Sequence, residues 1–275
     1  MFLRPRTLGE AVEALKRPGA RILAGGTDFY PALGDRPVAC PVVDITAIPE
    51  LSGITVTDRE IRIAGGTSWS EVIATPLPRC FDALKAAARE VGSVQIQNRG
   101  TVAGNLCNAS PAADGVPPLL ALDAEVELVS RAGRRRLPLA AFITGNRRTA
   151  RQEGEILASV IVPRRIEGPS CFLKLGVRRY LVISIAMVAA ILESEGGTVR
   201  QARIAVGACS AVAQRLTGLE QALAGVPAEP GIGSLVEPRH LAGLSPIDDV
   251  RATAAYRLDA ARTLVARALE HCAAG

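Results

Sequence analysis

The sequence predicts an α+β chain of about two domains, and three observations support this fold class. A length of 275 residues with 48% hydrophobic content leaves room for two cores, at roughly 150 residues per domain. Stretches with helical apolar spacing alternate with short apolar runs that end at glycine or proline. The stretch PRRIEGPS interrupts two strand patterns, so we expect a domain boundary near Pro163 to Gly168.

The first element is a short helix followed by a turn and a strand. Thr7 and Glu10 form a T-x-x-E capping box before apolar residues at helical spacing, and a Pro-Gly pair then ends the helix. The apolar run RILA predicts a strand. It leads into Gly25-Gly26-Thr27-Asp28, where paired glycines can adopt positive φ and point successive N–H groups at one ligand.

The tetrapeptide AGGT occurs a second time, at Ala64 to Thr67, again after an apolar run. Ser68 and Glu71 then form another capping box. Without a third copy this is not a solenoid repeat, and two tight strand exits are as good an interpretation as two ligand-binding loops. The first copy is the better ligand candidate because the polar Asp28 follows it directly.

After a helix that ends at Gly92, the stretch from Gly100 to Ser110 concentrates small polar residues and glycine. We expect an irregular backbone here, rich in N–H, hydroxyl and amide donors of the kind that bind phosphate. Ser110-Pro111 is typical of a helix N-cap and first turn, which would add a helix N-terminus to the site. The P-loop and Rossmann fingerprints are both missing, and a purely structural role for the glycines remains the alternative.

The remaining elements follow from periodicity and turn residues. We expect a hairpin over 124–139, a strand over 155–163, and two strands joined by a Glu-Gly-Gly turn over 186–209. Residues 213–225 predict a helix. A closing helix follows over 248–271, with Asp248 and Asp249 at its start.

Composition argues against nucleic-acid binding. The net charge is +5 and the isoelectric point about 9.1, yet aromatic residues, which stack on bases, make up only 3% of the chain. The basic runs at Arg131 to Arg136 and Pro163 to Arg165 flank predicted strands, so we interpret them as solvated turns or as a surface for a partner subunit.

Membrane, metal and disulfide chemistry are not expected either. The longest apolar stretch, Tyr180 to Leu192, is shorter than the roughly 18 residues of a membrane span, and no secretory leader is visible. The six cysteines form no C-x-x-C pair, which favours free thiols in a reducing cytoplasm. His240 and His271 have no ligand neighbours at metal spacing. Without a base, nucleophile or metal cluster, we expect a bound cofactor to carry the reaction.

Several long motifs, in order, resemble one known family. They are LAGGTDFYPAL, GTVAGNLCNASPAAD, EILASVIVP, KLGVRRYLVISIAMVAA and the closing DDVRATAAYRLDAARTLVARAL. The chain resembles the FAD-binding subunit of molybdenum hydroxylases, the group of xanthine dehydrogenase, carbon monoxide dehydrogenase and 4-hydroxybenzoyl-CoA reductase. This resemblance implies a two-lobed PCMH-type FAD-binding fold, with lobes 1–55 and 56–166. It also implies a smaller α+β C-terminal domain over 167–275, with an antiparallel sheet and helices.

The resemblance also implies the residues that bind FAD. One loop would wrap the pyrophosphate, and a second would support it with N–H groups and polar side chains; together they comprise Leu23, Ala24, Gly25, Gly26, Thr27, Asp28, Phe29, Tyr30, Thr101, Gly104, Asn105, Asn108, Ser110 and Asp114. Asp114 would reach the adenosine or ribityl side, and Ile156 or Leu157 would pack near the flavin ring. Lys174 would lie at the N1/O2 edge and stabilise the anionic reduced flavin; a solvated strand lysine is the alternative.

The chain departs from the family pattern at three positions. Ala103 replaces a second glycine, Gln97 replaces a common arginine, and Val182 replaces a frequent aspartate. An alanine is compatible with the loop if its φ stays negative. For Val182 the sequence suggests no function.

The resemblance implies an electron-transfer role. Substrate would be oxidised at a molybdopterin centre on a large partner subunit, electrons would pass through [2Fe-2S] clusters on a small partner, and FAD on this chain would deliver them to an acceptor. This chain would then contain no catalytic side chain and no metal, and neither substrate nor acceptor is encoded in it. The alternatives are a stand-alone flavin reductase of the same fold and a non-catalytic assembly subunit without FAD.

Overall fold

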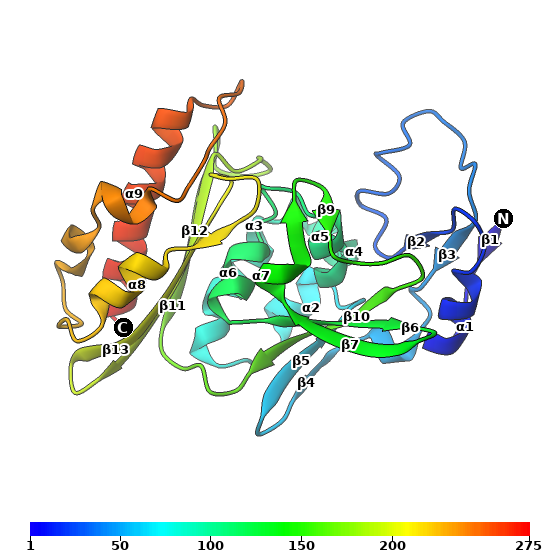
Figure 1. The fold of residues 1–275 in the computed structure, drawn as a ribbon, viewed down its shortest axis with the longest axis horizontal. Helices are drawn as coiled ribbons and strands as arrows, with labels where there is room; N and C mark the ends of the chain where they lie inside the picture. The colour runs from blue at the N-terminus through cyan, green and yellow to red at the C-terminus, as the bar shows by residue number, and fades with distance from the viewer.

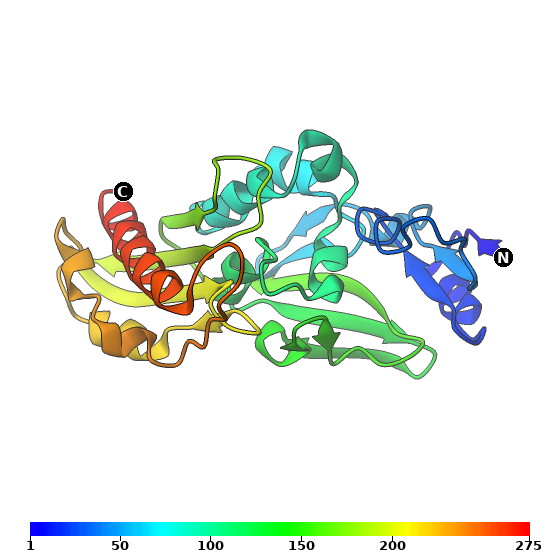
Figure 2. The same ribbon diagram turned by 90° about the horizontal axis from the view of Figure 1, so that it is seen from above.

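A computed structural model describes all residues, 1–275, and divides them into three units in a row (Figure 1). Each unit is built on its own sheet, and the view from above shows the second unit between the other two (Figure 2). The predicted boundaries at 55/56 and 166/167 stay predictions; the first falls within β4 (Ile54–Val56) and the second between β10 (Ile156–Pro163) and β11 (Ser170–Leu175).

The first unit is a small parallel sheet covered by one helix. The sheet has the order β1-β3-β2 and consists of β1 (Phe2–Leu3), β2 (Arg21–Leu23) and β3 (Val42–Asp44). Helix α1 (Leu8–Ala14) has Thr7 as its N-cap, and the 3-10 helix η1 (Pro49–Leu51) follows the sheet. The capping box is half formed, because the Glu10 carboxylate accepts a hydrogen bond from the N–H of Arg6 rather than of Thr7.

The second unit is an antiparallel sheet with helices on one side. Its order is β4-β5-β10-β6-β7, which adds β5 (Glu60–Ala64), β6 (Glu125–Ser130) and β7 (Gly133–Pro138) to the two strands above. A small hairpin pairs β8 (Ile143–Gly145) with β9 (Arg148–Thr149). The helices are α2 (Trp69–Ala74), η2 (Arg79–Phe81), α3 (Asp82–Glu90), α4 (Val94–Arg99), α5 (Val102–Asn108), α6 (Val116–Ala121) and α7 (Leu139–Phe142).

The third unit is an antiparallel sheet of order β11-β12-β13-β14, with β12 (Ala186–Glu195), β13 (Thr198–Gly207) and β14 (Gln214–Arg215). Its helices are α8 (Thr217–Leu223), η3 (Ile232–Leu235), η4 (Pro238–Leu241) and α9 (Ala254–Ala273), and α8 and α9 cover one face of the sheet (Figure 1). The α+β fold class with a C-terminal α+β domain is therefore confirmed.

Side chains alternate along a strand, so each strand of the third sheet presents side chains to both of its faces. Both faces of this sheet are buried. Met187 and Ala189 on β12 belong to the core of the second unit, whereas Val188 and Ala190 belong to the core under α8 and α9. The second and third units thus share an apolar interface in addition to the core of each.

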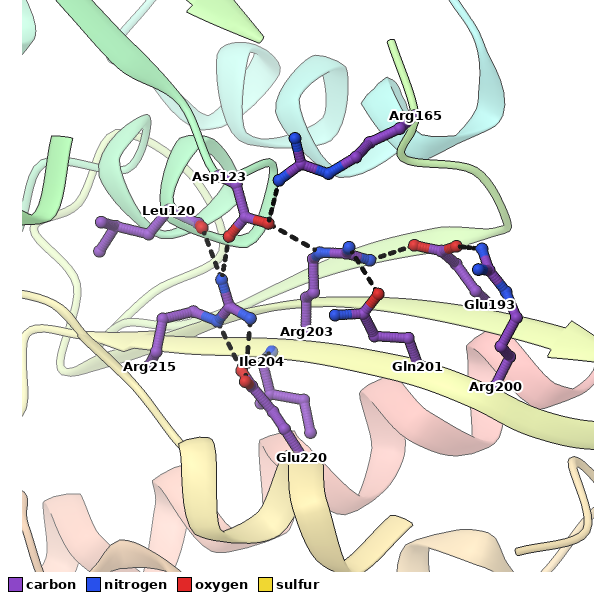
Figure 3. Close-up of polar contacts among 10 residues, drawn as sticks. All are labelled: Leu120, Asp123, Arg165, Glu193, Arg200, Gln201, Arg203, Ile204, Arg215 and Glu220. Atoms are coloured by element: carbon purple, nitrogen blue, oxygen red, sulfur yellow. Dashed lines mark hydrogen bonds and ion pairs between the residues drawn. The ribbon is translucent and has the colours of Figure 1, made fainter. Parts of the chain in front are cut away.

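A network of charges crosses the same interface (Figure 3). Asp123, in the turn after α6, accepts hydrogen bonds from Arg203 on β13 at 3.1 Å and from Arg215 on β14 at 2.7 Å. Arg203 also binds Glu193 on β12, and its side chain is only 3% exposed. Arg215 extends the network to Glu220 on α8. Charged contacts therefore join the two units in addition to the apolar contacts.

Three local expectations about α5, β7 and α9 are wrong. The stretch after Gly100 is the helix α5 rather than irregular backbone, because Thr101 caps it and Val102 and Leu106 are fully buried. The arginines 134–136 are in strand β7 rather than in a solvated turn, and they pair with Glu127, Glu155 and Glu60. Helix α9 begins at Ala254 after an N-cap at Thr253, so Asp249 lies outside its first turn.

No helix of the chain combines the length and the apolar character that crossing a membrane requires.

Candidate functional site

The loop that follows β2 offers an uninterrupted row of free donors. No backbone N–H from Ala24 to Phe29 is hydrogen-bonded within the chain. Gly26 has φ +77°, and a Cβ built there would lie 2.9 Å from the ring of Tyr30, so this position requires glycine. Arg21 stacks on Phe29 at 4.7 Å from the ring centroid, which anchors the far end of the loop. Free N–H groups on a glycine turn are suited to bind phosphate oxygens.

The second predicted loop is the N-terminus of α5. The Thr101 hydroxyl accepts a hydrogen bond from the N–H of Gly104 at 3.0 Å, and the Thr101 carbonyl accepts one from the N–H of Asn105 at 3.0 Å. The N–H of Val102 donates to the carbonyl of Thr67. Two N–H groups proposed for the cofactor are thus used within the chain, whereas that of Ala103 has no partner.

The two loops touch through their backbones. A Cβ built on Gly25 would lie 1.9 Å from the carbonyl oxygen of Arg99 and 3.0 Å from the Cα of Gly100. One cavity of about 550 Å³ lies where they meet, between the first two units. It is lined by Phe2, Arg4, Leu23, Ala24, Gly25, Gly26, Tyr30, Asp44, Ile45, Thr46, Ile48, Leu51, Ser52, Gly66, Ser68, Glu71, Asn98, Arg99 and Thr101.

Both AGGT copies line this cavity, the first through Gly25 and Gly26 and the second through Gly66. The second copy is also a tight strand exit, since a Cβ on Gly66 would lie 2.7 Å from the carbonyl oxygen of Leu51. The tight strand exit is therefore confirmed for the second copy, and its role as a ligand-binding loop stays a prediction.

The polar side chains of α5 and the turn after it have different environments. Asn105 Oδ1 is buried without a hydrogen-bond partner, which is rare for a buried amide oxygen. Asn108 Oδ1 accepts a hydrogen bond from Arg147. Ser110 accepts one from the N–H of Ala112 at 3.3 Å and caps no helix, so the N-cap expectation is wrong; the next helix begins only at Val116.

Asp114 and Lys174 form a buried ion pair. Lys174 Nζ on β11 lies 2.7 Å from Asp114 Oδ2, and the side chains are 6% and 9% exposed. The Ser184 hydroxyl donates to Asp114 Oδ1 at 2.8 Å. Burial raises the pKa of Asp114, and the hydrogen bonds and charge of Lys174 oppose that rise. Lys174 is therefore not a solvated strand lysine, and the pair brings two predicted site residues from the second and third units together.

A second cavity, of about 420 Å³, lies next to this pair. Its lining includes Lys174, Glu90 at the end of α3, and the two arginines Arg178 and Arg179. Val182 lines it as well and packs over Gly176, where a Cβ would lie 2.4 Å from Val182 Cγ1. Val182 thus has a packing role that the sequence did not suggest.

Ile156 and Leu157 are buried in two different cores. Ile156 packs in the core of the first unit and Leu157 in that of the second, because successive residues of β10 face opposite sides. Neither lines the larger cavity. Contact of either residue with a flavin ring stays a prediction.

Sequence reasoning missed several residues of this region. Arg99 and Asn98 line the larger cavity, Arg147 binds Asn108, and Ser184 binds Asp114. Arg99 immediately precedes a recognised glycine stretch, which is a usable signal. Arg147 and Ser184 have no local signal, because their partners are distant in the sequence.

Residues 1–165 match the family described as the FAD binding domain in molybdopterin dehydrogenase. The chain belongs to this family. Residues 172–272 of this FAD-binding family member also match the CO dehydrogenase flavoprotein C-terminal domain.

Relatives of this family member span nearly its whole length. It is 30% identical to the xanthine dehydrogenase FAD-binding subunit of Escherichia coli O157:H7, over 99% of the chain and 96% of the relative. It is 29% identical to the carbon monoxide dehydrogenase medium chain of Hydrogenophaga pseudoflava, over 96% and 94%. The crystal structure of quinoline 2-oxidoreductase from Pseudomonas putida 86 superposes with a TM-score of 0.91 at 27% identity, covering 100% of the chain and 96% of that structure.

The geometry of this FAD-binding family member fits its cofactor. FAD carries a pyrophosphate that needs several donors. The run of free N–H groups from Ala24 to Phe29 reaches the larger cavity at Ala24, Gly25 and Gly26. Asn105 Oδ1 is a buried acceptor that receives no hydrogen bond. The chain is the FAD-binding subunit of a heteromeric molybdenum hydroxylase, an oxidoreductase complex.

Proposed function

We propose that this chain receives electrons from [2Fe-2S] clusters on a small partner subunit and passes them through FAD to an acceptor. Substrate is oxidised at a molybdopterin centre on a large partner subunit. The relative in Hydrogenophaga pseudoflava is named as a medium chain, which supports a complex with larger and smaller subunits. The compartment we propose is the cytoplasm, where the six unpaired cysteines stay reduced.

The row of free N–H groups beside the Gly25–Arg99 contact is the observation that carries the FAD-binding part of this proposal. We assign the pyrophosphate to the loop Leu23 to Tyr30 and to the Ala103 N–H. Thr101 and Gly104 support it by shaping the α5 terminus, and Asn105 offers its unpaired oxygen to a donor of the cofactor.

Bound FAD supplies the redox chemistry, accepting electrons and passing them on. The chain supplies a charge for the cofactor. Lys174 is a buried cation between the second and third units, and Asp114 partly neutralises that cation. A nearby positive charge favours negative charge on a cofactor, and a buried one is weakly screened by solvent. Lys174 and Asp114 should therefore shift the flavin potential in opposite directions.

The spectrum and the metal content of the native complex test the proposal. We expect FAD, iron and molybdenum together, with FAD released as free cofactor by acid or heat. FAD without either metal would support a stand-alone flavin reductase instead. A complex without FAD would support an assembly subunit.

Reduction kinetics test the electron route. In the reconstituted complex, Lys174→Ala should slow flavin reduction by about ten- to a hundredfold, the effect of losing one charge-assisted interaction. Reduction of the clusters should continue at the wild-type rate. Lys85→Ala, at a half-buried lysine of α3, is the matched control. An unchanged flavin potential and rate would remove Lys174 from the site.

A further inference from the structure

Ser184 follows a segment that has little structure of its own. Residues 176–183 contain neither helix nor strand, and the apolar side chains of Val177, Tyr180, Leu181 and Ile183 are exposed. Ser184 itself is fully buried, and its hydroxyl is bound to Asp114. Something other than the preceding segment must therefore hold Ser184 in place.

Two arginines from the C-terminal part of the chain hold it. Arg251 Nη1 donates to the carbonyl of Ser184 at 3.1 Å, and Arg257 Nη1 donates to the carbonyl of Ile185 at 2.6 Å. Both guanidinium groups also bind Asp249: Arg251 through Nε at 3.0 Å, and Arg257 through Nη2 at 2.7 Å. One carboxylate thus orients two cations toward two successive carbonyls.

The burial of Arg257 is costly, which argues that its position matters. The residue is 0% exposed, and its Nε is buried without a partner. Burying a charged group is favourable only where partners compensate for lost hydration. Here these partners are Asp249 and the carbonyls of Ile185 and Ala208, at the start of β12 and the end of β13.

We propose that Asp249, Arg251 and Arg257 form a positioning cluster that fixes Ser184 against Asp114. Through Ser184 the cluster controls the charge of the Lys174–Asp114 pair, and, resting on the function proposed above, the redox behaviour of the bound flavin. These three residues touch neither Lys174 nor Asp114 directly; they act through the backbone of Ser184.

The cluster positions Ser184 so that its hydroxyl donates a hydrogen bond to Asp114. Asp114 has Lys174 on Oδ2 and Ser184 on Oδ1, and the charged groups that face it are Lys174 on β11 and Glu90 on α3. A donor to a carboxylate stabilises its charged form. Losing the Ser184 donor should therefore move the protonation of Asp114 to higher pH.

Lysine NMR of the flavin-free chain tests this step without relying on the cofactor. Lys16, Lys85 and Lys174 are the only lysines, so the Lys174 side-chain signal is assigned by its loss in Lys174→Arg. In the wild type this signal should report the titration of Asp114. In Ser184→Ala and in Arg251→Gln, the inflection (midpoint) of the pH titration that the Lys174 signal reports should rise by about one pH unit. This is the tenfold change expected for one hydrogen bond to a charge.

Three variants keep the test specific. Ser184→Thr retains the hydroxyl and should restore the wild-type inflection. Arg267→Gln, on an exposed part of α9, should leave it unchanged. If Arg251→Gln fails to fold, Asp249→Asn keeps the shape of the cluster, removes the charge that orients both arginines, and should give the same shift.

A double variant decides whether the residues act in one chain of contacts. Ser184→Ala/Arg251→Gln should shift the Lys174 inflection no further than either single variant, because both remove the same hydrogen bond. In the FAD-loaded chain, the pH dependence of the flavin potential should shift in parallel. Additive shifts, or a wild-type inflection in Arg251→Gln or Ser184→Ala, would overturn the inference. A wild-type chain that binds no FAD would instead contradict the proposed function, and the lysine titration would still test the cluster.

Discussion

Gly25 lies so close to Arg99 that the two glycine-rich segments are in backbone contact. A Cβ on Gly25 would lie 1.9 Å from the Arg99 carbonyl oxygen, well inside any tolerated contact. The row of free N–H groups begins beside this contact, at Ala24. The larger cavity lies where the first and second units meet. Their close approach there requires a residue without a Cβ at position 25.

Gly25→Ala should abolish or strongly weaken FAD binding. The methyl group must push the two segments apart, and overpacking of this kind costs about 1–3 kcal/mol in stability. Isothermal titration with FAD should show at least a tenfold loss of affinity. Gly218→Ala on α8 is the control, because a Cβ there meets nothing within 4 Å. Wild-type affinity in Gly25→Ala would mean that FAD does not bind where the segments meet.

Thr101→Ala should destabilise the start of α5. It removes the acceptor for the Gly104 N–H, and loss of an N-cap costs about 1 kcal/mol. Urea unfolding should show this loss, together with weaker FAD binding. Thr101→Ser keeps the hydroxyl and should behave like the wild type. Equal effects of the two substitutions would indicate that the methyl group, not the cap, matters.

Lys174→Ala should be strongly destabilising, because it leaves Asp114 buried without its counter-charge. Removing one partner of a buried pair costs about 3–5 kcal/mol. Adding Asp114→Asn should recover most of this loss. Urea unfolding of the single and double variants measures both effects, and no recovery in the double variant would argue against the pair as the cause.

The same variant predicts a pH dependence of defined sign. Burial already raises the pKa of Asp114 above the ordinary aspartate value of about 3.9, and loss of Lys174 should raise it further. The native state then binds more protons than the unfolded state between the unfolded and the folded pKa of Asp114, so stability falls as the pH rises through the folded pKa. Lys174→Ala should thus be less stable at pH 8 than at pH 5, and the double variant should not show this slope.

Glu127→Gln should destabilise the second sheet at neutral pH and have little effect in acid. Burial alone would raise the pKa of Glu127, but hydrogen bonds from Arg62, Arg134 and Arg136 lower it to about 2. The stability from this lowered pKa is present above the unfolded value of about 4.3 and is lost as the pH falls toward 2. At pH 7 we expect a loss of about 1.5–3 kcal/mol.

Thermal unfolding from pH 7 to pH 2 measures the effect of Glu127→Gln. Glu125→Gln, on the same strand and outside the arginine network, is the control. A difference from the wild type that persists unchanged at pH 2 would show that the charge of Glu127 is not responsible.

Asp123→Asn should loosen the third unit from the second. Asparagine tolerates the observed φ of +47° but cannot pair with Arg203 and Arg215 as a charge. Trp69, the only tryptophan, is buried in the second unit and reports its unfolding by fluorescence. Circular dichroism should fall before this fluorescence changes in Asp123→Asn. The two transitions should coincide in the wild type and in the exposed control Asp259→Asn.

Elements with strong periodicity could be predicted from the sequence. The hairpin β6–β7, strand β10 and the pair β12–β13 all appear where apolar alternation or a Glu-Gly-Gly turn indicates them. Helix α5 could not, because its glycine and asparagine residues are poor helix formers. It is stabilised by the tertiary burial of Val102 and Leu106 and by the Thr67 carbonyl.

The candidate site could be predicted in part. The first loop and its glycines follow from local backbone requirements, which a single sequence contains. The pairing of Lys174 with Asp114, 60 residues apart, depends on how the third sheet docks on the second unit. The link from Asp249 through Arg251 to Ser184 depends on the same docking, so no local pattern indicates it.

The alternation along β12 limits how this chain can be recombined with its relatives. Met187 and Ala189 fit the second unit, whereas Val188 and Ala190 fit the helices α8 and α9. A chimera that joins the first 166 residues of this chain to the C-terminal part of a relative would mismatch one face of the sheet and leave the other intact. A compatible chimera would have to match the odd-numbered side chains of β12, the apolar Phe172 and Ala205, and the charged partners Lys174, Arg203 and Arg215.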